Sequence, residues 1–218
     1  MYKVCVFDLD GTLVNTIADI AYGANRALQQ MGYPTHEEEA FRWMVGNGMQ
    51  MLCKRALPKE VQDNNAILAE LVERYNSYYC EHCCDISRPY PGIPEMIEKL
   101  KQAGVLCAVI SNKPHPQTQI VMRTLFQNDD FFYIEGQSER FARKPDPEAL
   151  LDCISHSKAS KSDVVYVGDS DVDAVFAHNA GIDCIGVAWG FRGKEELEHA
   201  GVKYLAETAE DIVDIVTG

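Results

Sequence analysis

The sequence predicts an α/β fold, in which a Rossmann-like, doubly wound parallel sheet carries a small α-helical domain inserted after its first strand. Short apolar runs alternate with segments of helical periodicity through most of the chain, as in parallel sheets covered by helices on both faces. Most of the runs are continuously apolar, as strands buried on both sides should be. No such run occurs between about residues 15 and 85, and this gap predicts the insertion.

Six apolar runs are predicted to form the strands of the sheet. The first five are nearly continuous in apolar residues, and the sixth is a weaker candidate. They are Tyr2–Phe7, Val105–Ile110, Phe131–Glu135, Asp163–Val167, Asp183–Val187 and Val202–Leu205.

Amphipathic segments between these runs predict the helices that cover the sheet. In the first, apolar residues recur at helical spacing from Ile93 to Leu100, and Gly104 stops the helix. Each of the others follows a strand or its loop directly, which is the order of a strand-helix unit. They are Pro114–Phe126, Pro147–Ser157 and Asp171–Ala180.

The inserted domain is predicted to span residues 15–85, which leaves residues 1–14 and 86–218 as the α/β core. Apolar residues from Ile17 to Met31 share one helical face, and a second long helical segment runs from about Asp63 to Cys80. A cluster of Pro and Gly between residues 89 and 94 marks the return to the core.

Composition and charge exclude several classes of protein. The chain has 20 Lys and Arg against 33 Asp and Glu, a formal net charge of −13, which argues against nucleic-acid binding through a basic face. No apolar run approaches the roughly 18 residues that cross a bilayer, and the N-terminus lacks the pattern of a cleaved signal peptide. We therefore expect a cytoplasmic protein with no nucleic-acid or membrane partner, whose oligomeric state the sequence leaves open.

The eight cysteines are interpreted chiefly as small, buried, reduced side chains. Cys80, His82, Cys83 and Cys84 lie within five residues and could supply half of a zinc site. Because no second pair of ligands follows elsewhere, the end of a helix that carries thiols is the favoured interpretation, and any role of this cluster stays open.

Acidic residues follow two of the predicted strands, at the edge where open α/β sheets bind ligands. Asp8 and Asp10 end the first strand, and Asp169 and Asp173 lie in an acidic loop after the strand that ends at Val167. Carboxylates so close together repel each other unless a cation neutralises them, and Mg²⁺ is the natural candidate because it takes oxygen ligands.

A phosphate site is predicted beside these acids. Ser111 directly follows the strand Val105–Ile110, and Lys144 lies in a short basic segment before Pro145. A hydroxyl and nearby backbone N–H groups can bind phosphoryl oxygens, and an ammonium stabilises the charge that develops when phosphorus is attacked.

Taken together, the four motifs resemble those of the haloacid dehalogenase superfamily. They are Asp-Leu-Asp-Gly-Thr at 8–12, Ser-Asn-Lys at 111–113, Lys-Pro at 144–145 and Gly-Asp-Ser-Asp-Val-Asp at 168–173. The helical insertion resembles the family's small α-helical cap. Within the superfamily the chain most resembles the phosphoglycolate phosphatases and their close relatives, partly through Trp-Met-Val-Gly-Asn-Gly at 43–48.

This resemblance implies a Mg²⁺-dependent phosphatase of small phosphorylated metabolites, with 2-phosphoglycolate the favoured substrate. Asp8 would attack phosphorus to form an aspartyl-phosphate, and Asp10 would protonate the leaving oxygen and later activate water. Asp169 would hold Mg²⁺ together with Asp8 and the backbone carbonyl of Asp10, and Asp173 would support that set directly or through water. The phosphoryl group would be held by Ser111 and Lys144, with Thr12 and Asn112 nearby.

The cap loop that contains Gly46 and Asn47 has two interpretations. It is either a simple turn or a loop that closes over the active site and helps to choose the substrate, as the family's cap does. By the same resemblance, the cap would open and close on linkers near residues 15 and 85.

Three other activities remain as alternatives. A sugar-phosphate mutase (like β-phosphoglucomutase) would use the same aspartyl-phosphate but pass it to a sugar hydroxyl, and a pyrophosphatase would differ only in the leaving group. A phospho-accepting signalling module also places acids and a lysine around Mg²⁺, but the long insertion argues against it.

Overall fold

A computed structural model describes residues 1–218 of the protein. Six strands form its central sheet. They are β1 (Val4–Phe7), β4 (Leu106–Pro114), β5 (Tyr133–Gln137), β6 (Val164–Gly168), β7 (Asp183–Val187) and β8 (Tyr204–Ala206). Their order across the sheet is β5-β4-β1-β6-β7-β8, and every neighbouring pair is parallel. The predicted α/β fold with a parallel, doubly wound sheet is therefore confirmed.

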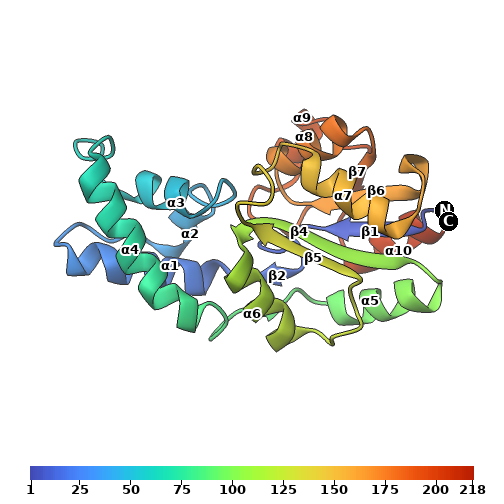
Figure 1. Cartoon of the computed structure of the whole chain (residues 1–218), viewed down its shortest axis with the longest axis horizontal. Helices are drawn as coiled ribbons and strands as arrows, with labels where there is room; N and C mark the ends of the chain where they lie inside the picture. Colours follow the sequence, from blue (N-terminus) through green and yellow to red (C-terminus); the bar gives the residue numbers. More distant parts are fainter.

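The helices fall into two groups (Figure 1). Four lie together at one end of the molecule, and the others surround the sheet. The first group consists of α1 (Ile17–Gln30), α2 (Glu38–Phe41), α3 (Met49–Ala56) and α4 (Asn65–His82). The second consists of α5 (Ile93–Gln102), α6 (His115–Leu125), α7 (Glu148–Ser157), α8 (Asp171–Ala180), α9 (Lys194–His199) and α10 (Ala209–Thr217), with a 3-10 turn at Lys161–Asp163.

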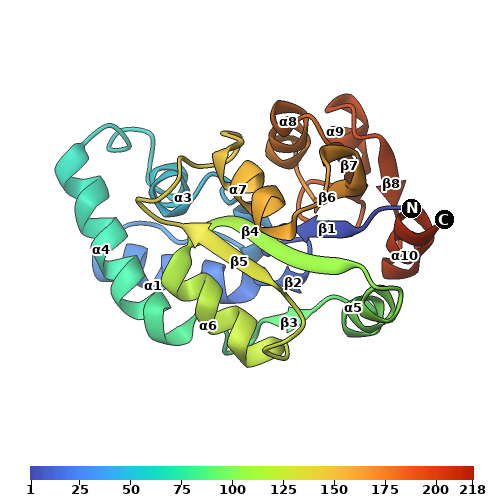
Figure 2. The ribbon, with the colours of Figure 1, turned by 45° about the vertical axis from the view of Figure 1, so that its right-hand side comes forward.

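Each face of the sheet packs against its own helices, because successive strand residues point to opposite sides. Cys5 and Phe7 of β1 belong to an apolar cluster that includes residues of α5, α6 and α10. Val4 and Val6 belong to a second cluster with residues of α7 and α8. Figure 2 shows α5 and α6 on one side of the sheet and α7 and α8 on the other. Burial on both faces explains why these strands are continuously apolar.

The elements depart from the sequence prediction mainly at their ends. β4 continues past the apolar run through Ser111 to Pro114, because its pairing with β5 resumes at Pro114 after an irregularity that follows Ile110. The helices α2, α3, α9 and α10 were not predicted from the sequence. The capping box of Thr208 and Asp211 at the start of α10 was a usable sign of a helix N-terminus.

Two short strands carry the chain between the sheet and the first helical group. β2 (Val14–Asn15) leaves the sheet and pairs antiparallel with β3 (Arg88–Pro89), which returns to it. Next to this pair, the buried carboxylate of Asp19 on α1 accepts hydrogen bonds from the N–H groups of Ile86 and Ser87, at 3.1 and 2.8 Å. The Ser87 hydroxyl also donates to it. The outgoing and returning segments are thus tied together.

The two chain ends lie together at the end of the molecule opposite to α1–α4 (Figure 1). There the Tyr2 N–H donates to the Val216 carbonyl. None of the helices combines the length and the apolar character that crossing a membrane requires.

Replacing Asp19 with Ala should destabilise the protein. The change leaves the buried N–H and hydroxyl of Ser87, and the N–H of Ile86, without their acceptor, so we expect the free energy of unfolding to fall by about 3 kcal/mol. Urea denaturation measures this loss. Asp63→Ala is the matched control, because Asp63 is 88% exposed and pairs with Lys54, and it should leave the free energy of unfolding nearly unchanged. Equal effects of the two substitutions would contradict the structural role of Asp19.

Candidate active site

A pocket lies where the carboxyl ends of the strands face α1, α3 and α4. Polar residues enter it from the ends of β1, β4 and β6, which are neighbours in the sheet. Apolar residues enter it from the helical group. The lining from the core includes Asp8, Asp10, Ser111, Asn112, Lys113, Lys144, Asp169 and Asp173, and the lining from the helical group includes Ile20, Val45, Gly46, Met49, Leu52, Tyr75 and Tyr79.

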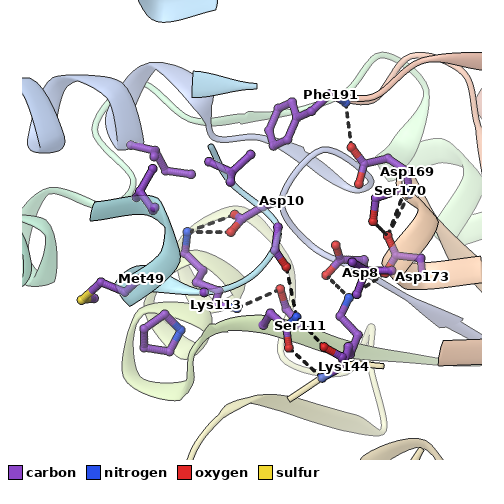
Figure 3. Close-up of a pocket in the computed structure, with 18 of the residues that line it drawn as sticks. Asp8, Asp10, Met49, Ser111, Lys113, Lys144, Asp169, Ser170, Asp173 and Phe191 are labelled. Atoms are coloured by element: carbon purple, nitrogen blue, oxygen red, sulfur yellow. Dashed lines mark hydrogen bonds and ion pairs between the residues drawn. The ribbon is translucent and has the colours of Figure 1, made fainter. Parts of the chain in front are cut away.

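Three buried carboxylates form an acidic cluster on the floor of this pocket (Figure 3). One oxygen each from Asp8, Asp169 and Asp173 lies within 4.8 Å of the others. Lys144 Nζ lies 2.9 Å from Asp8 Oδ1 and 2.7 Å from Asp173 Oδ1. Three carboxylates therefore face one ammonium, and the two negative charges left over match the charge of a divalent cation.

Burial and mutual repulsion disfavour the ionised forms of Asp8 and Asp169. Burial raises the pKa of Asp8 to about 6, although the nearby Lys144 ammonium opposes this rise. The pKa of Asp169 is raised well above its usual range by burial and by the charges of Asp173 and Asp8. Burial alone would lower the pKa of Lys144, but Asp173 and Asp8 outweigh it and keep the ammonium charged.

The oxygens of Asp173 are already occupied by protein donors. Oδ1 accepts from Lys144, and Oδ2 accepts from the Ser170 hydroxyl at 2.7 Å and from the N–H groups of Asp169 and Ser170. The bond from the Ser170 N–H is part of the capping box that begins α8. Asp173 therefore fixes Lys144 and the loop before α8.

Asp8 and Asp169 are better placed to bind a metal ion. Asp8 Oδ1 is buried, and the Lys144 ammonium, 2.9 Å away, is the one donor group paired with it. Asp169 Oδ2 accepts from the Phe191 N–H at 2.7 Å. Gly11 has a φ of +86°, and a Cβ there would lie 2.3 Å from Asp169 Oδ2, so the close approach of the two loops requires glycine. An all-oxygen ligand set of this kind suits Mg²⁺.

Asn112 joins the phosphate side of the pocket to the helical group. Its side-chain oxygen accepts from the Lys144 N–H at 2.9 Å, and its Nδ2 donates to the Gly46 carbonyl at 3.0 Å. Ser111, directly before it, is buried, and its hydroxyl accepts from the Lys113 N–H at 3.3 Å. The extension of β4 thus places Ser111 and Asn112 beside Lys144.

Asp10 is paired with Lys113, a residue that was assigned no role from the sequence. Lys113 Nζ lies 3.0 and 3.2 Å from the two oxygens of Asp10 and donates to the Tyr79 hydroxyl of α4 at 2.6 Å. Burial alone would lower the pKa of Lys113, but the Asp10 carboxylate helps to produce a net rise. The position of Lys113 directly after Ser111 and Asn112 could have indicated its place in the pocket.

Two of the predicted site residues do not line the pocket. The Thr12 hydroxyl is buried without a hydrogen-bond partner, and its carbonyl accepts from Trp189 Nε1. The Asn47 side-chain oxygen accepts from Arg55 at 2.7 Å, while the neighbouring Gly46 lines the pocket.

Arg192 also lines the pocket and was not singled out by sequence. Its guanidinium donates to the carbonyls of Arg42 and Val45, the latter at 2.9 Å. The N–H of the preceding residue, Phe191, donates a hydrogen bond to Asp169. Phe191 and Arg192 together therefore contact both the acidic cluster and the helical group.

The cysteine cluster lies apart from these carboxylates. Cys80 donates to Asn76 at 3.4 Å, His82 pairs with Asp85 at 2.8 Å, and Cys83 is buried. Of all the His, Cys, Asp and Glu side chains, those of Asp8, Asp169 and Asp173 are the group whose ligand atoms could hold a metal ion together.

Comparison with known proteins places the chain in a family. Residues 5–187 match the family model of the haloacid dehalogenase-like hydrolases. A phosphoglycolate phosphatase from Mannheimia succiniciproducens is 33% identical over 220 residues, which cover 99% of this chain and 98% of that protein.

Two solved structures share the fold over nearly the whole chain. A protein from Lactobacillus delbrueckii subsp. bulgaricus has a TM-score of 0.94 at 29% identity, over 100% of this chain and 99% of its own. A predicted phosphoglycolate phosphatase from Haemophilus somnus has a TM-score of 0.91 at 29% identity, over 98% and 97% of the two chains. The chain therefore belongs to the family of haloacid dehalogenase-like hydrolases.

Proposed function

We propose that this protein is a Mg²⁺-dependent phosphatase that hydrolyses small phosphate monoesters, with 2-phosphoglycolate as its preferred substrate. The observation that carries this proposal is the buried cluster of Asp8, Asp169 and Asp173 with Lys144 beside it, since its charge and its oxygen ligands suit a divalent cation and a phosphoryl group. The phosphoglycolate phosphatases among its relatives guide the choice of substrate.

Asp8 and Asp169 would hold the metal ion through carboxylate oxygens, together with the backbone carbonyl of Asp10. Asp173 would act through its bonds to Lys144 and to the loop that carries Asp169. When bound, Mg²⁺ supplies positive charge that neutralises the carboxylates and the phosphoryl oxygens.

The side chains of the pocket divide the reaction between them. An Asp8 oxygen attacks phosphorus and forms the aspartyl-phosphate, while Asp10 gives a proton to the ester oxygen as the alcohol leaves. Asp10 then takes a proton from the water that attacks this intermediate, which releases phosphate and restores Asp8. Lys144, Ser111 and Asn112 hold the phosphoryl oxygens throughout, so positioning and charge supply most of the catalysis.

Residues 15–85 are proposed to act as a cap over a catalytic core formed by residues 1–14 and 86–218. Three contacts between core and cap support this division: Asn112 to Gly46, Arg192 to Val45, and Lys113 to Tyr79. A closed cap excludes bulk water during phosphoryl transfer. Gly46 would face the substrate directly, and Asn47 would shape the loop through its bond to Arg55. Thr12 would help to fix the loop that carries Asp8 and Asp10, since its carbonyl accepts a hydrogen bond from Trp189.

Replacing Asp8 with Asn should abolish phosphate release, because the amide is not a nucleophile. The measurement is phosphate release with and without Mg²⁺ from 2-phosphoglycolate, sugar phosphates, nucleotides and pyrophosphate. We expect Mg²⁺-dependent release that is fastest from 2-phosphoglycolate, and a loss of at least about 10⁴-fold in the variant.

Asp129→Asn serves as the control, since the Asp129 side chain is 79% exposed. Retained activity in Asp8→Asn would rule out Asp8 as the nucleophile. No release from any compound by the unmodified protein would favour the mutase or the signalling module, and release from pyrophosphate alone would favour the pyrophosphatase.

Replacing Asp169 with Asn should weaken Mg²⁺ binding at least about tenfold, because even residues that only orient metal ligands have effects of this size. Isothermal titration of the protein with Mg²⁺ measures the change without any turnover. Asp171→Asn is the matched control: Asp171 lies two residues away, is exposed, and accepts from the N–H of Val172. Equal Mg²⁺ affinities of the two variants would exclude Asp169 as a ligand.

A further inference from the structure

The proposed reaction leaves one buried cation of the pocket without a task. Lys113 is 5% exposed, and burying an ammonium is costly unless it serves as a partner for anions. Its contacts come from both sides of the pocket: the Asp10 carboxylate belongs to the core and the Tyr79 hydroxyl to α4. The Tyr79 ring lies under the same ammonium, with its centre 4.8 Å from Nζ.

The other two cations that line the pocket are already committed. Lys144 lies between Asp8 and Asp173 on the floor. Arg192 donates to carbonyls of the helical group. In Figure 3, Lys113 stands on the side of Asp10 that faces Met49, and Asp8 and Lys144 stand on the other side. Lys113 is therefore the cation on the leaving-group side of the phosphoryl site.

We infer that Lys113 binds a carboxylate carried by the alcohol part of the substrate and so selects short phosphate esters of hydroxy acids. This inference rests on the proposed phosphatase function and adds a residue that decides the substrate. An incoming carboxylate takes the place of Asp10 as the partner of the ammonium, and Tyr79 keeps the ammonium in position.

The position of Lys113 also limits how far the carboxylate can be from phosphorus. Asp10 must reach the ester oxygen to protonate it, and Lys113 Nζ lies 3.0 Å from an oxygen of the same Asp10 carboxylate. An anion that reaches Lys113 is thus only a few atoms from the ester oxygen. In 2-phosphoglycolate one carbon separates the ester oxygen from the carboxylate, whereas the second phosphate of a sugar bisphosphate lies several atoms further away.

The Tyr79 contact links this recognition to the cap. Tyr79 is buried on α4, so its hydroxyl reaches Lys113 when the cap rests on the core as it does here. Recognition of the carboxylate and closure of the cap therefore depend on the same ammonium.

The test compares 2-phosphoglycolate with 2-hydroxyethyl phosphate, in which a neutral hydroxymethyl group replaces the carboxylate, in the full-length protein with Mg²⁺. Both have a poor leaving group and need Asp10, so the ratio of their kcat/KM values isolates the carboxylate. We expect the unmodified protein to prefer 2-phosphoglycolate, and Lys113→Met to lower this ratio by about 100-fold, the usual cost of losing one partner of a buried charge pair.

Two further variants keep the test decisive if Lys113→Met folds poorly. Lys113→Arg keeps the charge and should retain most of the preference, and Tyr79→Phe removes the hydroxyl and should lower the ratio to an intermediate value. Lys99→Met, on the far helix α5 where Lys99 pairs with Glu210, should leave the ratio unchanged. Circular dichroism establishes that each variant is folded.

The outcomes separate this inference from the proposed function. If the unmodified protein releases phosphate equally well from both compounds, or if Lys113→Met slows both equally, Lys113 does not select a carboxylate although the protein is a phosphatase. If the unmodified protein releases no phosphate from any ester, the proposed function itself has failed. Loss of the preference in Lys113→Met, with hydrolysis of 2-hydroxyethyl phosphate retained, supports the inference.

Discussion

The repulsion between three buried carboxylates is the constraint on which the rest of the active site depends. Asp8, Asp169 and Asp173 each place an oxygen within 4.8 Å of the others, away from bulk water, and such a cluster persists only when cations and donors surround it. Lys144 supplies one charge, the start of α8 supplies N–H groups to Asp173, and Phe191 supplies another to Asp169. The parallel sheet makes this possible, because neighbouring strands deliver all of these groups to one edge.

Much of the fold and part of the site could be predicted from the sequence. Continuous apolar strands and strand-helix order are local patterns, so the sheet and the family were predicted correctly. Acids at strand ends are also local patterns, and Asp8, Asp10 and Asp169 all enter the pocket. The contacts of Lys113 with Tyr79 and of Arg192 with Val45 join residues far apart in the chain, and no local pattern indicates them. Thr12 and Asn47 lie beside the pocket because a motif fixes the position of a loop but not the direction of every side chain in it.

Three residues of the core, Asn112, Lys113 and Arg192, each contact the helical group. Each also contacts a polar group of the pocket, Arg192 through its neighbour Phe191. Asn112 contacts Lys144, Lys113 contacts Asp10, and Phe191, next to Arg192, contacts Asp169. Lifting the helical group would break the outer contact of each and loosen three different parts of the site together. The pocket is therefore best ordered when it is closed, which suits an enzyme that must keep water away until an intermediate has formed.

The central place of β1 has a consequence for the synthesis of the chain. Val4 pairs with Leu106 on one side and with Val164 on the other, so the first strand leaves the ribosome long before either neighbour exists. Because ribosomes add roughly 5–20 residues per second, β4, the first neighbour of β1, is made about 5–20 s later. The whole of α1–α4 is made in that interval, so the contacts within this group, such as those between α1 and α4, can form before the sheet does. The strand that carries Asp8 and Asp10 must therefore stay unpaired in the nascent protein, where its apolar side chains are a natural binding site for chaperones.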